Sequence, residues 1–210
     1  MKILYIILFC SIQTFAQVAA NSDVRKNELI EQCLTVMGGK QAWENTIWDK
    51  FNQDVIIEKI GNTNPYKIWV NLTTKQGKAF VNNTWVEHPD SLKVWMNKGY
   101  EIWVNDAYWL VMPFKLKDNG VNLKYLGYKK NSKQADCEVI ELTFNNVGVT
   151  PENKYHIYFD NNTHLICEWS YFEKFSDNEP KMTTPWENYQ KYGNILFNRG
   201  KFNLDNISVR

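Results

Sequence analysis

Residues 136–172 (DCEVIELTFNNVGVTPENKYHIYFDNNTHLICEWSYF) carry the pattern that decides the fold. Large apolar residues occupy every second position in three runs, 139–144, 155–159 and 165–171. This period of two is typical of strands that bury one face. The polar segments between the runs are short enough to reverse the chain, so the three runs predict neighbouring antiparallel strands.

The same period extends toward the N-terminus. Residues 67–73 and 94–104 also alternate, and Asn82-Asn83 and Asn97-Lys98-Gly99 supply turn residues. We therefore expect strands in both segments. No strand–helix–strand alternation is present, which excludes a doubly wound parallel sheet. One helix is expected before the strands, capped at 21–23 and ended by Gly38-Gly39.

The first residues predict export. Lys2 is followed by the apolar run 3–12 and by Thr14-Phe15-Ala16, which has small residues at the positions that precede a cleavage site. We expect residues 1–16 to be a signal peptide and 17–210 to be a single domain. The run is too short to cross a membrane. The protein is predicted in the periplasm or outer envelope of a bacterium, without a transmembrane segment.

Charge and cysteine content limit the partners. The net charge is +1 and becomes zero once the segment with Lys2 is removed, so the chain offers nucleic acid no electrostatic attraction. The balance favours neutral or apolar partners.

Cys33, Cys137 and Cys167 remain after export. We expect buried thiols rather than a disulfide, because Cys137 and Cys167 are predicted on strands separated by a third.

Chemical motifs are missing from the sequence. The chain has no nucleophile elbow, no glycine-rich phosphate loop and no cysteine or histidine spacing typical of a metal site. His156 alternates with apolar neighbours on an expected strand, where a structural role is favoured over a catalytic one. We therefore predict a protein that is not an enzyme and that uses no cofactor and no metal.

Residues 105–128 (NDAYWLVMPFKLKDNGVNLKYLGY) are the most distinctive segment. Five large apolar residues lie within 108–114, interrupted by Pro113, which cannot donate to a strand ladder. We expect a compact turn that plugs one end of a curved sheet, or a lid over a cavity.

This segment resembles the signature of a family of exported bacterial-envelope proteins of unknown function. Met37-Gly38-Gly39 with Trp43 is similar to that family's start, and Trp186-x-x-Tyr189-x-x-Tyr192-Gly193 to its end. Asn119 departs from the pattern, where proline is expected. The family in turn resembles the LolA/LolB-like lipoprotein-localisation superfamily. The resemblance implies an incomplete antiparallel barrel with helices closing a hydrophobic cavity that takes acyl chains.

The expected fold is therefore mainly β: a strongly curved antiparallel sheet, or incomplete barrel, with an N-terminal helix and a short helical plug, as in LolA/LolB-like proteins. The first functional hypothesis is non-catalytic binding of an apolar ligand, a lipid or a lipid-modified protein, and a carrier is one form of this hypothesis. The cavity would be lined by apolar strand positions and by the 108–114 segment: Ile68, Val70, Leu72, Tyr100, Ile102, Val104, Tyr108, Trp109, Met112, Phe114, Tyr125, Ile140, Leu142, Phe144, Ile157 and Phe159.

Two alternatives remain open. The chain has nine tryptophans and eleven tyrosines, more aromatic surface than one core face needs. A glycan-binding module would use such rings as platforms with asparagines as polar partners, the candidates being Trp69, Trp85, Trp95 and Trp103. A structural envelope protein would instead fill the cavity with its own core.

Overall fold

The computed structural model describes residues 2–45, 54–61 and 63–198, and the chain divides into two compact units. Unit 1 comprises Met1–Trp43 and Pro113–Arg210, and unit 2 comprises Glu44–Met112. The single domain expected over 17–210 stays a prediction. Each unit is described by itself.

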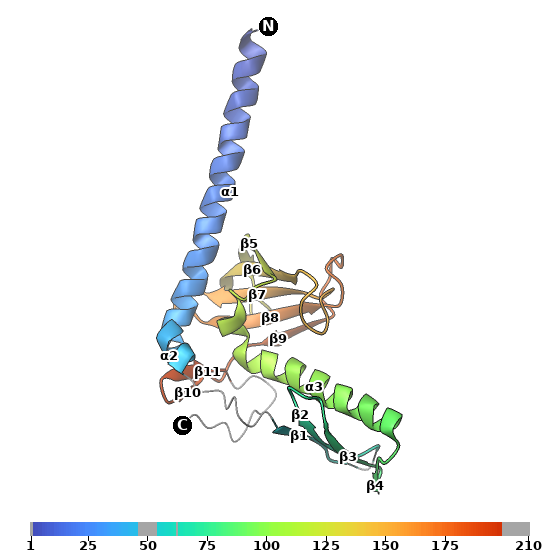
Figure 1. The fold of residues 1–210 in the computed structure, drawn as a ribbon. Helices are drawn as coiled ribbons and strands as arrows, with labels where there is room; N and C mark the ends of the chain where they lie inside the picture. The colour runs from blue at the N-terminus through green and yellow to red at the C-terminus, as the bar shows by residue number, and fades with distance from the viewer. Residues whose placement is uncertain (1, 46–53, 62, 199–210) are drawn as a thin grey trace. The chain divides into compact units, whose positions relative to one another are not determined.

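Unit 1 is built on a five-stranded antiparallel sheet in which the strands follow one another in chain order (Figure 1). Its elements are α1 Lys2–Val36, α2 Gly39–Asn45, whose last two residues belong to unit 2, β5 Val121–Lys130, β6 Asp136–Phe144, β7 Lys154–Asp160, β8 Ile166–Phe172, β9 Met182–Pro185 and the hairpin β10 Gln190–Tyr192 with β11 Ile195–Phe197. The three strands predicted from residues 136–172 are confirmed as β6, β7 and β8. Ile140, Ile157 and Trp169 lie opposite one another across them and have at most 1% of their surface exposed.

The C-terminal part of α1 belongs to the core of unit 1. Leu29, Ile30 and Cys33 are buried at helical spacing, and so is Met37 just after the helix. The helix ends where the sequence predicts: Gly38 and Gly39 have φ angles of 115° and 81°. The predicted cap at 21–23 is wrong for the full chain, because α1 is continuous from Lys2 to Val36.

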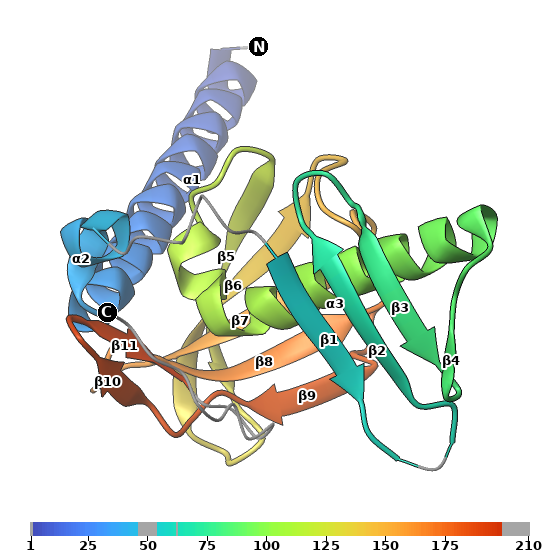
Figure 2. The same ribbon diagram turned by 60° about the horizontal axis from the view of Figure 1, so that its bottom comes forward.

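Unit 2 contains a four-stranded antiparallel sheet packed against one helix (Figure 2). Its elements are β1 Asp54–Lys59, β2 Tyr66–Asn71, β3 Gly77–Val81, β4 Thr84–Trp85 and α3 Pro89–Lys115, whose last residues belong to unit 1. The core consists of Ile68, Val70 and Ala79 from the sheet and Met96 from α3. The strand predicted over 67–73 is confirmed as β2.

The strand predicted over 94–104 is wrong, because this segment lies within α3. Pro89 occupies the first helical position and Asp90 follows in the first turn, both favourable at a helix start. Gly99 makes no turn: it lies mid-helix against β2, where an added Cβ would come within 2.9 Å of an Ile68 methyl carbon. The glycine permits close packing of helix on sheet.

The turn or lid predicted over 108–114 is also wrong, since these residues form the end of α3. The helix continues past Pro113 to Lys115. Pro113 marks the division between the units, and from there Phe114 stacks on Trp43 in unit 1 with ring centroids 4.5 Å apart. A helix of 27 residues therefore replaces the expected short plug.

The architecture is mainly β, with antiparallel sheets, an N-terminal helix and a central helix. Neither multi-stranded sheet of the described residues closes into a barrel. In the same part of the chain, no helix combines the length and the apolarity needed to cross a membrane.

Candidate binding face

The sheet of unit 2 has two different faces. One face packs against α3 through Ile68, Val70 and Ala79. The register places Ile56, Trp69 and Lys78 in one row of the other face, and Glu58, Lys67, Phe80 and Trp85 in the next. Side chains on a strand alternate between faces, so these two rows lie away from α3.

Three aromatic rings on this side of the sheet form one contiguous cluster. The Trp69 and Trp85 centroids are 5.5 Å apart with planes tilted by 31°, and Phe80 meets Trp85 edge-on at 5.1 Å. Trp85 is 47% exposed and the neighbouring Ile56 is 59% exposed. We call this surface the aromatic face, defined as Ile56, Trp69, Phe80 and Trp85 with Lys67 and Lys78.

Two lysines border the rings. The Lys78 Nζ lies 4.9 Å from the Trp69 centroid and 5.2 Å from that of Trp85, within range of a cation–π contact. The Lys67 Nζ lies 5.5 Å from the Trp69 centroid and 3.3 Å from Oε2 of Glu58. Glu58 therefore offsets the charge of Lys67, whereas Lys78 leaves a positive charge beside both indoles.

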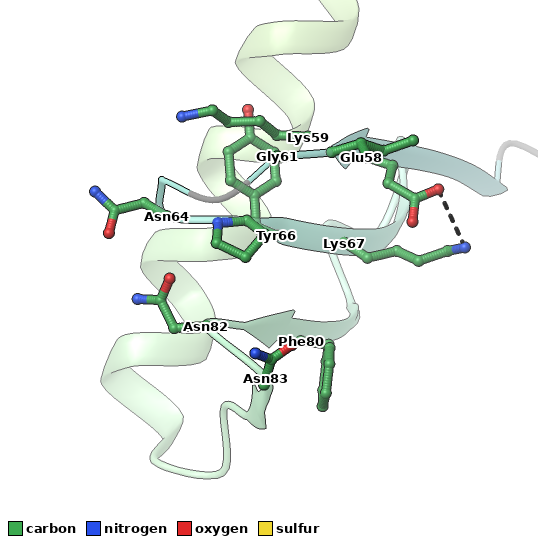
Figure 3. A pocket seen from close by; sticks show the side chains of 11 residues that line it. Glu58, Lys59, Gly61, Asn64, Tyr66, Lys67, Phe80, Asn82 and Asn83 are labelled. Atoms are coloured by element: carbon green, nitrogen blue, oxygen red, sulfur yellow. Dashed lines mark ion pairs between the residues drawn. The ribbon is translucent and has the colours of Figure 1, made fainter.

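A groove of about 890 Å³ adjoins the aromatic face at the hairpin ends of the sheet (Figure 3). Phe80 and Lys67 belong to both surfaces. The other residues that line the groove are mostly polar: Glu58, Lys59, Ile60, Gly61, Asn64, Pro65, Tyr66, Asn82 and Asn83. Lys67 and Phe80 thus bring the amides of the groove close to the rings of the aromatic face.

Two asparagines of the groove also form a turn of the backbone. Asn82 and Asn83 form the two-residue turn between β3 and β4, with φ angles of 50° and 65°. Positive φ at both positions is the type I′ turn, which suits the twist of a hairpin and which asparagine tolerates. The turn predicted from Asn82-Asn83 is confirmed, and it presents two amides to the groove (Figure 3).

The proposed glycan platforms divide into two groups. Trp69 and Trp85 lie on the aromatic face. Trp95 and Trp103 lie instead on α3. Trp95 packs against the core of unit 2 and its ring lies 5.4 Å from that of Tyr66. The alternation signal was correct for Trp69 but misleading for the two helical tryptophans. Phe80 was missed, although the register with Trp85 would have identified it once the Asn82-Asn83 turn was placed.

The residues predicted to line an apolar cavity are distributed over both units. Ile68, Val70, Leu72, Tyr100, Ile102, Val104, Tyr108, Trp109 and Met112 belong to unit 2, and Phe114, Tyr125, Ile140, Leu142, Phe144, Ile157 and Phe159 to unit 1. Ile68, Val70, Met112, Ile140, Leu142, Ile157 and Phe159 are no more than 1% exposed, and Phe114 is 7% exposed. The remaining eight are partly buried. Their role as ligand contacts stays a prediction.

One histidine of unit 1 has a carboxylate partner. Nε2 of His156 lies 3.3 Å from Oε2 of Glu141 on the neighbouring strand, and its ring packs on Phe172. Burial lowers the pKa of His156, which keeps the imidazole neutral near pH 7. Ser170, opposite His156 in the register, shares a hydrogen bond with the Thr183 hydroxyl at 2.8 Å. The structural role expected of His156 and the absence of catalysis both stay predictions.

The cysteines differ from expectation in one respect. Cys33 and Cys137 are fully buried, Cys167 is partly buried, and all three are free thiols. A strand does separate Cys137 on β6 from Cys167 on β8, as predicted. The expectation that this strand keeps the thiols apart is wrong, because their Sγ atoms are 3.4 Å apart.

Among the described residues, no three acidic, histidine or cysteine side chains are grouped to hold a metal ion.

Comparisons with known proteins give little guidance. No family model matches the chain, and no curated protein matches it. A solved structure described as a DUF1329 family protein from Desulfovibrio piger ATCC 29098 is similar over 65% of this chain and 55% of that chain, with 13% sequence identity and a TM-score of 0.33. The similarity thus spans about half the length of that protein.

Proposed function

We propose that the protein binds a carbohydrate chain along the aromatic face and the adjoining groove of unit 2, without changing it chemically. The observation that supports this most is the contiguous cluster of Trp69, Phe80 and Trp85, which leaves Trp85 47% exposed beside a groove lined by asparagines. The rings also stabilise the sheet as cross-strand neighbours, but the exposed side of Trp85 is open to a partner.

The chemistry of a sugar ring matches this surface. A pyranose has an apolar face of C–H groups and a rim of hydroxyls. Indole rings offer a flat, rigid surface that loses little conformational entropy on binding. The amides of Asn64, Asn82 and Asn83 can each donate and accept hydrogen bonds with hydroxyls. The surface can therefore satisfy both aspects of a sugar.

Lys78 favours a carbohydrate that carries acidic groups. Its ammonium lies beside both indoles, where it can donate to a carboxylate or phosphate of a sugar stacked on Trp85. A charged hydrogen bond at the edge of an aromatic platform stabilises an acidic sugar more than a neutral one.

The apolar-ligand hypothesis is supported by less accessible surface. Among its predicted contacts, Ile68, Val70, Ile140 and Leu142 are at most 1% exposed, so they pack against other side chains. The aromatic face offers rings that a partner can reach. Export to the bacterial envelope is part of this proposal, because polysaccharide is abundant there and residues 1–16 match a signal peptide.

Calorimetric titration with a short oligogalacturonate and a neutral cello-oligosaccharide tests the proposal. The wild-type protein should bind the acidic chain. Trp85→Ala should weaken binding by about tenfold, equivalent to about 1.4 kcal/mol, as expected for an aromatic contact at the centre of a site.

Tyr128→Ala is the matched control, because Tyr128 is an aromatic residue of unit 1 that is 65% exposed. It should bind as the wild type does. The proposal is overturned if neither oligosaccharide binds, or if Trp85→Ala and Tyr128→Ala bind equally well.

A further inference from the structure

Cys137 and Cys167 lie in contact although β7 separates their strands. The Sγ–Sγ distance is 3.4 Å. Neighbouring strands are about 4.8 Å apart, so two residues on alternate strands are ordinarily about twice that distance from each other. Some local feature must bring these thiols together.

A bulge in β8 provides that feature. Tyr158 pairs with Glu168 and Phe159 pairs with Ile166, which leaves Cys167 without a partner in the register. The extra residue of a bulge changes the direction of its side chain. The Cys167 Sγ lies 3.4 Å from the carbonyl oxygen of Tyr158 on β7. The side chain thus leans across the intervening strand toward Cys137.

Burial makes the thiols of Cys137 and Cys167 slow to react, but a small reagent can still reach Cys167. Burial raises the pKa of both thiols, that of Cys167 to about 12, so little thiolate is present near pH 7. Cys167 is partly exposed, whereas Cys137 is fully buried. Cys33 is also fully buried, and its Sγ lies 3.7 Å from Sδ of Met37. A small disulfide can therefore reach Cys167 more readily than the other two thiols.

We propose that Cys137 and Cys167 are a disulfide-forming pair that joins β6 to β8 across β7 when the protein meets a low-molecular-weight disulfide such as oxidised glutathione. The Cys167 thiolate attacks one glutathione sulfur, which releases one reduced glutathione and forms a mixed disulfide. The Cys137 thiolate then attacks the Cys167 sulfur and releases the second. The pair loses two protons and two electrons, and one glutathione disulfide is reduced.

The bond requires the sulfurs to approach to about 2.0 Å, through side-chain rotation and a small adjustment of the strands at the bulge. It would close a loop between positions 30 residues apart, and a cross-link of this size raises stability mainly by restricting the unfolded chain. The midpoint of thermal unfolding should therefore rise by several degrees.

The test uses the full chain, reduced and then equilibrated with oxidised glutathione under native conditions. Remaining thiols are alkylated after denaturation, and peptides are mapped by mass spectrometry. We expect a peptide pair linked through Cys137 and Cys167, an alkylated Cys33, a higher midpoint of thermal unfolding, and reversal of these changes by dithiothreitol.

Cys137→Ser supplies the matched control. It should retain glutathione on Cys167 and show no rise in the thermal midpoint. The proposal is overturned if the wild-type protein at equilibrium leaves both cysteines free, carries glutathione on Cys167 without the link, or forms a link that includes Cys33. The main test uses the wild-type chain, so its result stands even if Cys137→Ser fails to fold.

Discussion

Arg25 of α1 and Glu138 of β6 form an ion pair inside unit 1. Nε of Arg25 donates to Oε1 of Glu138 at 2.8 Å, and a second guanidinium nitrogen bonds Oε2. Only 1% of the Glu138 side chain is exposed, and its Oε1 also accepts from the Tyr125 hydroxyl at 2.6 Å. The carboxylate stays charged in the core because these donors satisfy it, and the hydrogen bond from Arg25 lowers the pKa of Glu138.

Arg25→Met should destabilise the protein by leaving this carboxylate buried without its guanidinium. Breaking a fully buried ion pair typically lowers the free energy of unfolding by 3–5 kcal/mol. The Arg25 side chain is 34% exposed, so we expect a smaller loss, about 2 kcal/mol, measured by urea denaturation. Lys117→Met, which removes an exposed pair with Glu31, should lower it by less than about 1 kcal/mol. Equal losses in the two variants would contradict a buried role for Arg25.

The same pair predicts a pH dependence. The pKa of Glu138 is lowered from 4.5 in the folded protein, so its contribution to stability is present above pH 4.5 and is lost as the pH falls through the folded pKa. Unfolding free energies of the wild type and of Glu138→Gln, measured at intervals below pH 5.5 or so, should therefore converge with decreasing pH. Parallel curves over that interval would show that Glu138 titrates alike in the folded and unfolded chain.

Gly99→Ala should destabilise unit 2, although alanine is ordinarily the better helix former. An added Cβ would lie 2.9 Å from the Ile68 Cγ2 and 3.1 Å from the Val70 Cγ1, so the helix or the sheet must shift. Overpacking of this kind lowers the free energy of unfolding by about 1–3 kcal/mol. Val94→Ala, at a helical position that is 64% exposed, is the control and should change it little. A stabilised Gly99→Ala would mean that α3 does not pack closely on β2.

The three central strands of the unit 1 sheet could be predicted because each carries its own alternating pattern. In β6, β7 and β8 the alternating apolar residues coincide with the buried face, and short turns fix the order of the strands. The turn at Asn82-Asn83 was equally predictable from its residues. These features depend on residues that are close together in the sequence, so a single sequence is enough to predict them.

The helix α3 was missed because two periods overlap in its sequence. Val94, Met96, Tyr100, Ile102 and Val104 fit an alternation, but the buried side instead follows the helical spacing of Leu92, Trp95, Met96 and Gly99. Pro89 and Asp90 were the signal that favoured a helix. The contact between Cys137 and Cys167 could not be predicted, because a bulge depends on how strands pair and leaves no mark in the local pattern.

Lys78→Met should separate acidic from neutral ligands. The methionine retains an unbranched apolar stem beside Trp69 and Trp85 but removes the ammonium. We expect affinity for an oligogalacturonate to fall by about tenfold, since a hydrogen bond to a charged group contributes about 1.5–3 kcal/mol, while affinity for a neutral oligosaccharide stays unchanged.

Lys124→Met, at an exposed position on β5 of unit 1, provides the control for loss of one positive charge. It should leave both affinities as they are. An equal loss of acidic-ligand binding in the two variants would mean that net charge, rather than the position of Lys78, determines the preference.

The most direct test follows the indole N–H signals of the nine tryptophans in two-dimensional NMR spectra during titration with an oligogalacturonate. Carbohydrate binding at the aromatic face predicts that the signals of Trp69 and Trp85, assigned with single phenylalanine variants, shift with a common saturation curve. Those of the buried Trp169 and Trp186 in unit 1 should stay in place. Spectra in which Trp69 and Trp85 do not move at millimolar ligand, or in which only other indoles move, would contradict the proposed function.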